Sequence, residues 1–306
     1  MIRQTWRLAA ETCAEIVWRM PALEPAFVGI GARTWRTPGV GRFYRSAAWR
    51  LAERLRQSRT PFRAVTVATH PLVLDVTEFT AGPLYFGGSL YEPATTAAFT
   101  RFLRAGQLFI DIGANHGYFS LLAAALVGPA GRVVAFEPNP RVFAQLQAHV
   151  TLNHFEGRIR PEACALADAP QANAALYVSQ VDSNSGLSSL TPNADTLARG
   201  SLSASATVPV MVETFDRWLA AANLLATRTA IDLVKIDVEG AEERVISGMR
   251  DTLRRGVIRA LIVETPWESA AHRAIVAAGY DARALDHGDG GLTNVLFTTR
   301  RRHDHA

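Results

Sequence analysis

The sequence predicts an α/β fold whose core is a doubly wound, mostly parallel β-sheet. Segments of strand length alternate with helical patterns from residue 107 to residue 278. The apolar run at 107–111 ends in Asp111 and is followed by a Gly-x-Asn-x-Gly loop and an apolar helix. A second apolar run, at 132–136, ends in Glu137 about twenty residues further on, where a carboxylate can bind ribose hydroxyls. Together these observations predict a nucleoside-containing ligand at the carboxyl ends of the strands.

The remaining elements follow from the same apolar patterns. Strands are expected at 107–111, 132–136, 159–164, 231–237 and 258–264, and a closing hairpin at 279–299. Helices are expected to begin near Tyr118, Arg141, Phe215 and Glu242, with another from Ser269 to Ala278. A short helix at 95–104 leads into the sheet. Residues 62–80 alternate as a hairpin whose turn we place at His70-Pro71.

Two amphipathic helices are expected upstream, at 2–20 and 42–57, joined by a Pro- and Gly-rich linker. The first shows a stripe composed of Ile2, Trp6, Ala9, Cys13, Ile16 and Met20. Residues 1–60 hold 11 arginines and four glutamates, whereas the net charge of the whole chain is +4. We therefore expect a basic helical extension at 1–60 and the main domain at 61–306, with its core at about 85–298. The extension either covers the core or another subunit, or forms a peripheral contact with a membrane.

Residues 179–207 are rich in Ser, Asn, Thr, Ala and Gly and show no apolar period. They follow the third strand, so they are either a mobile lid over the substrate or a disordered segment. Two cysteines give no disulfide framework and no metal spacing, which favours a cytoplasmic protein. No apolar run is long enough to span a bilayer, and Glu11 and Glu15 argue against a signal peptide.

The Gly-x-Asn-x-Gly loop differs from a dinucleotide-binding loop, because Asn115 stands where the second glycine would be. Its side chain obstructs the close approach of a diphosphate, and Asp111 would repel one. An acid at this place suits a cationic ligand. S-adenosylmethionine carries an amino group and a sulfonium and has no phosphate, so it is the expected cofactor.

Three ordered blocks make the chain resemble the FkbM-type methyltransferases. They are the run beginning Asp111-Ile-Gly-Ala-Asn-His-Gly, the run Ala135-Phe-Glu-Pro-Asn-Pro140, and the run from Asp232 to Glu242. The resemblance covers roughly residues 85 to 298. It implies a class I methyltransferase fold, which is Rossmann-like with a seven-stranded sheet, and methyl transfer from S-adenosylmethionine, most often to a hydroxyl oxygen.

The first two blocks supply the expected cofactor site. We expect the methionine end to lie against Asp111, Gly113, Ala114, Asn115, Gly117 and Tyr118. The alternative for Tyr118 is a packing residue at the helix start. Glu137, with Pro138 and Asn139, is expected to hold the ribose. Asp168 is expected either to reach the adenine amino group or to be a turn residue.

The third block supplies the expected chemistry. Lys235, Asp237 and Glu239 alternate, so a continuing strand places them on one face, and Glu264 ends the next strand. Either Lys235 or a carboxylate is the base, or Asp237, Glu239 and Glu264 hold magnesium or manganese. A merely structural Lys235–Asp237 pair is the alternative.

The expected function is O-methylation of a small molecule or glycan. The first alternative is nucleic-acid methylation through the basic arm, which is disfavoured because the arm lacks interleaved aromatic residues. The second is a non-catalytic binding protein on a methyltransferase fold. The acceptor and the oligomeric state have no readable signature in the sequence.

Overall fold

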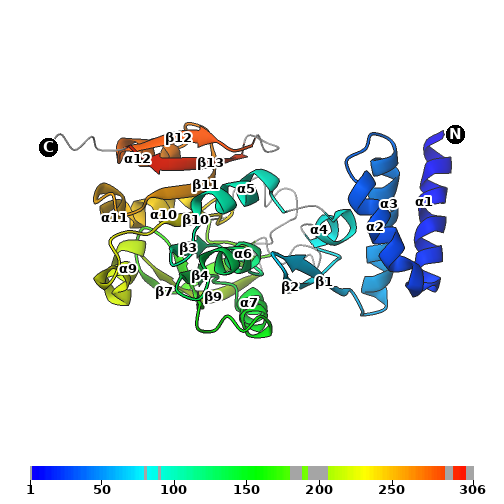
Figure 1. Cartoon of the computed structure of the whole chain (residues 1–306), viewed down its shortest axis with the longest axis horizontal. Coiled ribbons are helices and arrows are strands. Elements are labelled where there is room, and N and C mark those ends of the chain that lie inside the picture. Colours follow the sequence, from blue (N-terminus) through cyan, green and yellow to red (C-terminus); the bar gives the residue numbers. More distant parts are fainter. Residues whose placement is uncertain are drawn as a thin grey trace. The chain divides into compact units, whose positions relative to one another are not determined.

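The structure is a computed structural model that describes residues 2–78, 81–88, 91–179, 188–191, 206–286 and 292–300, with side chains from Trp6 onward. The described residues form two compact units (Figure 1), one up to Pro93 and the other from Ala94. Each unit has its own apolar core. The division falls later in the chain than residue 60, where the sequence predicts the boundary, so the functional division at residue 60 stays a prediction.

The first unit contains α1 (Ile2–Arg19), the 3-10 helix η1 (Pro21–Leu23), α2 (Glu24–Thr34), α3 (Val40–Gln57), β1 (Phe62–Val67), β2 (His70–Asp75) and α4 (Ala81–Gly87). The linker expected after α1 is wrong, because α2 occupies it. Pro25 lies in the first turn of α2, where a missing N–H costs nothing. The hairpin is confirmed but its turn is not at His70-Pro71. The turn is at Ala68 and Thr69, whose φ angles are 45° and 80°, and His70 already pairs with Val67.

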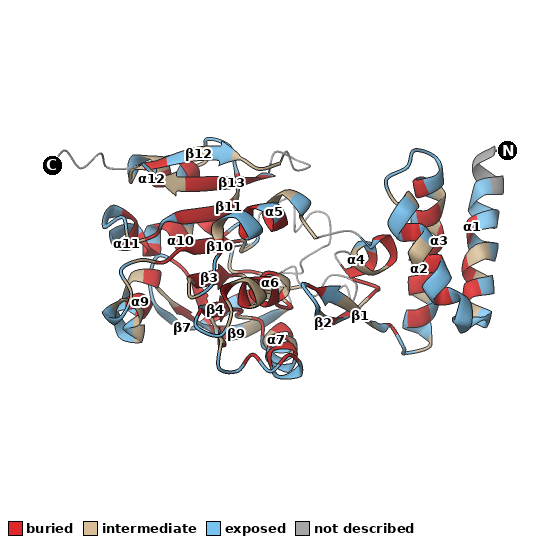
Figure 2. Cartoon of the chain, in the orientation of Figure 1, coloured by how far each residue is buried: buried red, intermediate tan, exposed pale blue. Residues whose placement is uncertain are grey.

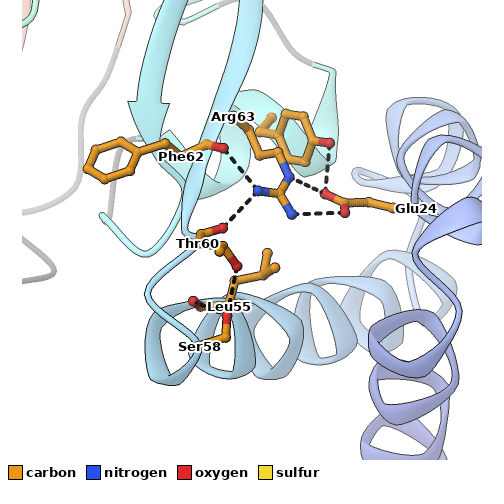
Figure 3. Close-up of polar contacts among 7 residues, drawn as sticks. Glu24, Leu55, Ser58, Thr60, Phe62 and Arg63 are labelled. Carbon is orange, nitrogen blue, oxygen red and sulfur yellow. Dashed lines mark hydrogen bonds and ion pairs between the residues drawn. The ribbon is translucent and has the colours of Figure 1, made fainter.

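A buried polar network explains why the hairpin belongs to this unit (Figure 3). Glu24, at the start of α2, accepts from Arg63 Nε at 2.6 Å and from Arg63 Nη2 at 3.0 Å. The Tyr85 hydroxyl of α4 donates to the same carboxylate at 2.9 Å. Glu24 is only 9% exposed, and a bidentate, buried ion pair is geometrically strict. The network therefore ties β1 and α4 to α2.

Helix α1 packs on α3 through a face that the sequence pattern did not select. Its buried residues are Ala10, Ala14 and Val17, whereas Trp6 of the predicted stripe is 50% exposed and Ile16 is 48% exposed. The small alanines allow a close approach to α3. Arg50–Glu11 and Arg54–Glu15 ion pairs at 3.2 and 3.1 Å fix the rotation of α1. The apolar stripe is thus left facing outward.

The second unit contains the seven-stranded sheet, and the predicted fold class is confirmed. Its strands lie in the order β12-β13-β11-β10-β3-β4-β5. They are β3 (Leu108–Ile112), β4 (Arg132–Phe136), β5 (Ile159–Glu162), β10 (Leu233–Ile236), β11 (Ala260–Pro266), β12 (Tyr280–Ala284) and β13 (Leu292–Thr299). β3, β4, β5, β10 and β11 pair in parallel, and β13 is antiparallel to both of its neighbours. The strand order reverses between β3 and β10, which is where such sheets bind ligands.

Helices cover both faces of this sheet (Figures 1 and 2), and its central strands β3 and β10 are wholly buried. One face carries α5 (Pro93–Phe102), α6 (Tyr118–Val127) and α7 (Pro140–Leu152). The other carries α9 (Phe215–Ala222), η2 (Leu224–Ala226), α10 (Glu242–Gly248), α11 (Arg250–Arg254) and α12 (Ala270–Ala277). Residues of β3 alternate accordingly, with Phe109 against Phe99 of α5 and Ile110 in the core beneath α9.

A second, four-stranded sheet was not predicted. Its order is β6-β9-β7-β8, formed by β6 (Cys164–Leu166), β9 (Thr207–Glu213), β7 (Gln171–Val178) and β8 (Ser188–Ser189). The single strand expected at 159–164 is divided into β5 in the main sheet and β6 in this one. Most of the polar segment 179–207 lies outside the described residues. No helix in the described part of the chain has the length and apolarity needed to cross a membrane.

Candidate functional site

The loop between β3 and α6 is held against the ends of two neighbouring strands. The N–H groups of Gly113 and Ala114 both donate to Phe136 O at the end of β4, at 3.1 and 2.8 Å. On the other side, a Cβ on Gly113 would lie 1.8 Å from the carbonyl oxygen of Asp237, and the φ of Gly113 is 84°. Glycine at 113 is therefore required for contact between the expected cofactor loop and the expected catalytic strand.

Glu137 lies beside this loop with both carboxylate oxygens engaged by backbone groups. Oε2 accepts from Asn115 N at 3.0 Å, and Oε1 accepts from Asn139 N at 2.8 Å. The residue is 6% exposed, and burial raises the pKa of its carboxyl to about 7. Pro138 is half-buried, and Asn139 also accepts from Arg141 N as the N-cap of α7. The carboxylate is thus preorganised at the tip of β4.

Asn115 gives this loop a polar group without an internal partner. Its backbone is left-handed, with φ 51°, and its Oδ1 is buried with no hydrogen bond in the structure. A buried amide oxygen left unpaired is costly, and its usual explanation is a missing ligand or water. An amino group or hydroxyl of a nucleoside cofactor would supply the donor that it lacks. The residues present therefore fit the methionine and ribose portions of S-adenosylmethionine.

The other predicted cofactor residues lie in different settings. Asp111 is 1% exposed and accepts from Ser120 Oγ at 2.7 Å; burial raises its pKa to about 6. Tyr118 is half-buried at the start of α6, and Gly117 precedes it with φ 93°. Asp168 forms a 2.7 Å ion pair with Arg244 of α10, which lowers the pKa of the carboxyl. The direct cofactor contacts of these residues stay predictions.

Lys235 and Asp237 form the centre of the second cluster. Lys235 is 2% exposed, and its Nζ donates to Asp237 Oδ2 at 2.7 Å. The same Nζ lies 4.8 Å from the centroid of the Phe119 ring, and Lys235 is the register partner of Asp111. Burial opposes ionisation of Asp237, but the ammonium of Lys235 outweighs it and lowers the pKa of the carboxyl. Asp237 is therefore an ionised carboxylate, and its side chain is 20% exposed.

Glu264 is the protonated neighbour of this carboxylate. The charge of Asp237, followed by burial, raises the pKa of Glu264 to about 10, so the carboxyl carries a proton and donates it to Asp237. Glu264 pairs in register with Asn294 of β13, which binds Asp286 through its backbone N–H at 3.0 Å. Neutral and ionised acids thus share one hydrogen bond at the ends of β10 and β11.

The loop after β10 turns sharply and carries the last predicted residue. Glu239 has φ 54° and Gly240 has φ 98°. Although part of Glu239 is exposed, desolvation of its carboxylate and the charge of Asp237 raise its pKa. Glu242 closes the loop by accepting from Val238 N and Gly240 N at 3.2 and 3.1 Å. Glu242 is therefore a structural residue that sets the position of Glu239.

The described part of the polar segment meets both halves of the site. Asn139 Nδ2 donates to Ser188 Oγ at 3.0 Å, and Thr191 Oγ1 donates to Gly240 O at 3.4 Å. Residues 188–191 therefore contact the expected ribose loop and the expected catalytic loop. The rest of the predicted lid lies outside the described residues.

A divalent metal ion held by Asp237, Glu239 and Glu264 is the alternative that the sequence leaves open. Within the described ranges, no group of three or more His, Cys, Asp or Glu side chains is placed to hold one. The magnesium or manganese site expected from Asp237, Glu239 and Glu264 stays a prediction.

Several supporting residues were missed by the sequence analysis. Ser120 of α6 donates to Asp111, and Asn294 of β13 is the register partner of Glu264. Phe119 of α6 lies against Lys235, and Arg244 of α10 pairs with Asp168. The sequence indicated that Ser120 and Phe119 lie near the site, because they follow the glycine loop directly. Asn294 begins a run, Asn294-Val-Leu-Phe297, that resembles the family, but its position beside Glu264 depends on strand order. Arg244 carried no sequence signal, because its contact with Asp168 depends on the rotation of a helix.

The fold and this site define an S-adenosylmethionine-dependent methyltransferase domain. The family model described as "Methyltransferase FkbM domain" matches residues 111–278, which is more than half of the chain. The chain belongs to the FkbM methyltransferase family.

Two curated relatives and one solved structure illustrate the similarity. The 31-O-demethyl-FK506 methyltransferase FkbM of Streptomyces tacrolimicus is 32% identical over 163 residues, covering 49% of this chain and 62% of the relative. The methyltransferase sdnD of Sordaria araneosa is 25% identical over 221 residues, covering 66% of this chain and 84% of the relative. An O-methyltransferase structure from Bacillus cereus covers 68% of this chain and 82% of its own, at 11% identity and a TM-score of 0.38, which is too low to carry an argument.

Proposed function

We propose that this protein transfers the methyl group of S-adenosylmethionine to a hydroxyl oxygen of a small molecule or glycan. The observation that carries the proposal is the 2.7 Å hydrogen bond from the buried Lys235 ammonium to Asp237 Oδ2 at the end of β10. The backbone of Asp237 packs against Gly113, so the expected proton acceptor lies beside the expected cofactor loop. Bound S-adenosylmethionine supplies an electrophilic methyl group on a sulfonium.

In this proposal, the Glu137 carboxylate accepts hydrogen bonds from both ribose hydroxyls. Asn115 Oδ1 accepts a hydrogen bond from an amino or hydroxyl group of the cofactor. Gly113 and Gly117 let the loop pack against Asp237 O and the Leu146 side chain. The loop, with the small Ala114 between them, then presents its backbone to the methionine end. Pro138 and Asn139 hold Glu137 in place. The negative charges of Asp111 and Asp237 favour a cationic sulfonium nearby. Asp168 and Tyr118 line the edges of the same site.

Asp237 acts on the acceptor in the same proposal. Its carboxylate accepts a hydrogen bond from the acceptor hydroxyl and orients the oxygen for in-line attack on the methyl carbon. As the new C–O bond forms and the C–S bond breaks, the O–H proton passes to the Asp237 carboxylate. The products are the methyl ether and S-adenosylhomocysteine. Asp237, whose side chain is 20% exposed, then releases the proton to solvent.

Lys235 has a positioning role in this scheme rather than that of the base. It is almost fully buried and its Nζ donates to Asp237, so the ammonium keeps Asp237 ionised. The name of the Streptomyces tacrolimicus relative describes methylation at an oxygen of a small molecule. That supports a hydroxyl acceptor, and the substrate class is inferred from it by similarity.

The test is transfer of a labelled methyl group from S-adenosylmethionine to a panel of hydroxylated glycans and small molecules, with and without added magnesium. The matched variants are Asp237→Asn and, as a control at an exposed surface acid, Asp281→Asn. We expect transfer by the wild type and the control, independent of magnesium, and a loss of about a hundredfold or more for Asp237→Asn. Equal turnover by Asp237→Asn would place the chemistry elsewhere, and transfer to RNA alone would overturn the acceptor class.

A further inference from the structure

One end of the first unit combines exposed arginines with exposed apolar side chains. α1 and α3 run parallel, because Trp6 packs on Phe43 and Glu11 pairs with Arg50. The end of α2 meets the start of α3 through the Trp35–Tyr44 ring contact and the bond from Arg45 Nη1 to Trp35 O. The start of α1, the α2–α3 turn and the start of α3 therefore gather at one end of the helices.

We call this surface the basic helical tip and define it by its exposed residues Trp6, Ile30, Arg33, Arg36, Val40, Arg42 and Arg45. No acidic residue occurs between Glu24 and Glu53 in the sequence. The acids of α1, Glu11 and Glu15, are tied to arginines of α3 further along the helices. The tip is thus a region of concentrated positive charge.

The apolar residues of the tip are exposed to solvent. Trp6 is 50% exposed, Ile30 is 54% exposed and Val40 is 49% exposed. Each lies next to arginines rather than in a purely polar surface. Arginine beside Trp and aliphatic side chains is the composition that enters the boundary between lipid headgroups and acyl chains.

We propose that the basic helical tip docks on an anionic membrane surface, with the arginines on lipid phosphates and carboxylates and with Trp6, Ile30 and Val40 inserted among the headgroups. An RNA partner would account for the arginines, but it would leave the two aliphatic side chains in water. The proposal does not depend on the methyl-transfer chemistry, because all of its residues lie in the first unit.

The test is co-sedimentation of the full chain with vesicles of phosphatidylcholine alone or mixed with phosphatidylglycerol. The variant is the triple change Arg33→Glu, Arg36→Glu and Arg42→Glu. The control, Arg250→Glu, Arg254→Glu and Arg255→Glu, alters three exposed arginines at α11 and makes the same change in net charge. An arginine near an anionic bilayer raises partitioning on the order of fivefold, so the tip variant should lose on the order of a hundredfold and the control much less. Circular dichroism verifies that both variants remain folded.

A second variant separates insertion from charge. Ile30→Ser with Val40→Ser leaves the charge unchanged and should weaken binding to anionic vesicles severalfold, with a steeper loss on adding salt. Equal binding to neutral and anionic vesicles, equal loss in the tip and α11 variants, or no vesicle binding by the wild type would each overturn the proposal. Tip-dependent binding to single-stranded RNA without vesicle binding would assign the surface to nucleic acid instead.

Discussion

Binding of the cofactor product S-adenosylhomocysteine should depend on pH through Glu137. Its carboxyl is 6% exposed, and burial raises its pKa from the ordinary 4.5 to about 7. That difference corresponds to roughly 3 kcal/mol by which burial disfavours the ionised form. Because ribose hydroxyls are best accepted by an ionised carboxylate, binding below neutral pH should be accompanied by release of a proton.

The magnitude follows from this linkage. One proton released per ligand weakens the affinity up to tenfold for each pH unit below the pKa. Because half of the carboxyl groups are already protonated at about pH 7, the loss from about pH 7 to about pH 5.5 should be roughly sixteenfold. Above about pH 8 the affinity should be constant. Asp111, with a pKa of about 6, adds a further dependence at the acid end.

The assay is calorimetric titration across this range in buffers with different ionisation enthalpies, which counts the protons released. Glu137→Gln should bind more weakly and lose the slope between pH 5.5 and pH 7. Glu156→Gln, at an exposed glutamate of the same unit, should behave as the wild type. A pH-independent affinity in the wild type, or an unchanged slope in Glu137→Gln, would refute the assignment of Glu137 to the ribose.

Three further changes test the packing around the site and the first unit. Gly113→Ala should weaken S-adenosylhomocysteine binding at least tenfold in calorimetry, because its Cβ would meet Asp237 O at 1.8 Å; unchanged binding would contradict the loop geometry. Lys235→Met should lower the free energy of unfolding, measured by urea denaturation, by about 3 kcal/mol, because it leaves Asp237 without its buried cation. The loss of unfolding free energy should be smaller at pH 4, where Asp237 of the variant is closer to neutral. Arg63→Met should cost about 3 kcal/mol by orphaning the buried Glu24, with restoration on adding Glu24→Gln; a cost without restoration would contradict the ion-pair explanation.

The raised pKa of Glu137 also makes the stability of the ligand-free protein depend on pH. Its folded pKa lies above its unfolded value, so the protonated form contributes stability that is full below about pH 4.5 and lost as the pH rises through about 7. The ionised carboxylate thus destabilises the ligand-free protein under the conditions where it binds the cofactor best.

The main sheet and the two halves of the site could be predicted because their signals are local. Asp111 and Gly113 occupy one strand and its turn, Glu137 ends the next strand, and Lys235 and Asp237 share one face by a period of two. Parallel strands bring their carboxyl ends to one edge, so the clustering followed from the order of elements.

The missed features depend on tertiary contacts. β7 is rich in alanine and β9 contains Pro209, so neither carries a strong strand signal until the two strands pair. The packing face of α1 could not be predicted, because small residues next to the apolar stripe fit α3 better than the large ones. The pKa of Glu264 is raised only when folding places Asp237, at the end of β10, beside it on the neighbouring strand β11.

The most direct test of the account is a crystal structure with bound S-adenosylhomocysteine. The account predicts that the ribose hydroxyls lie within hydrogen-bond distance of the Glu137 carboxylate, that Asn115 Oδ1 gains a donor, and that the sulfur faces the crevice in front of Asp237. A ribose bound away from Glu137, or a sulfur on the far side of the loop from Asp237, would contradict it.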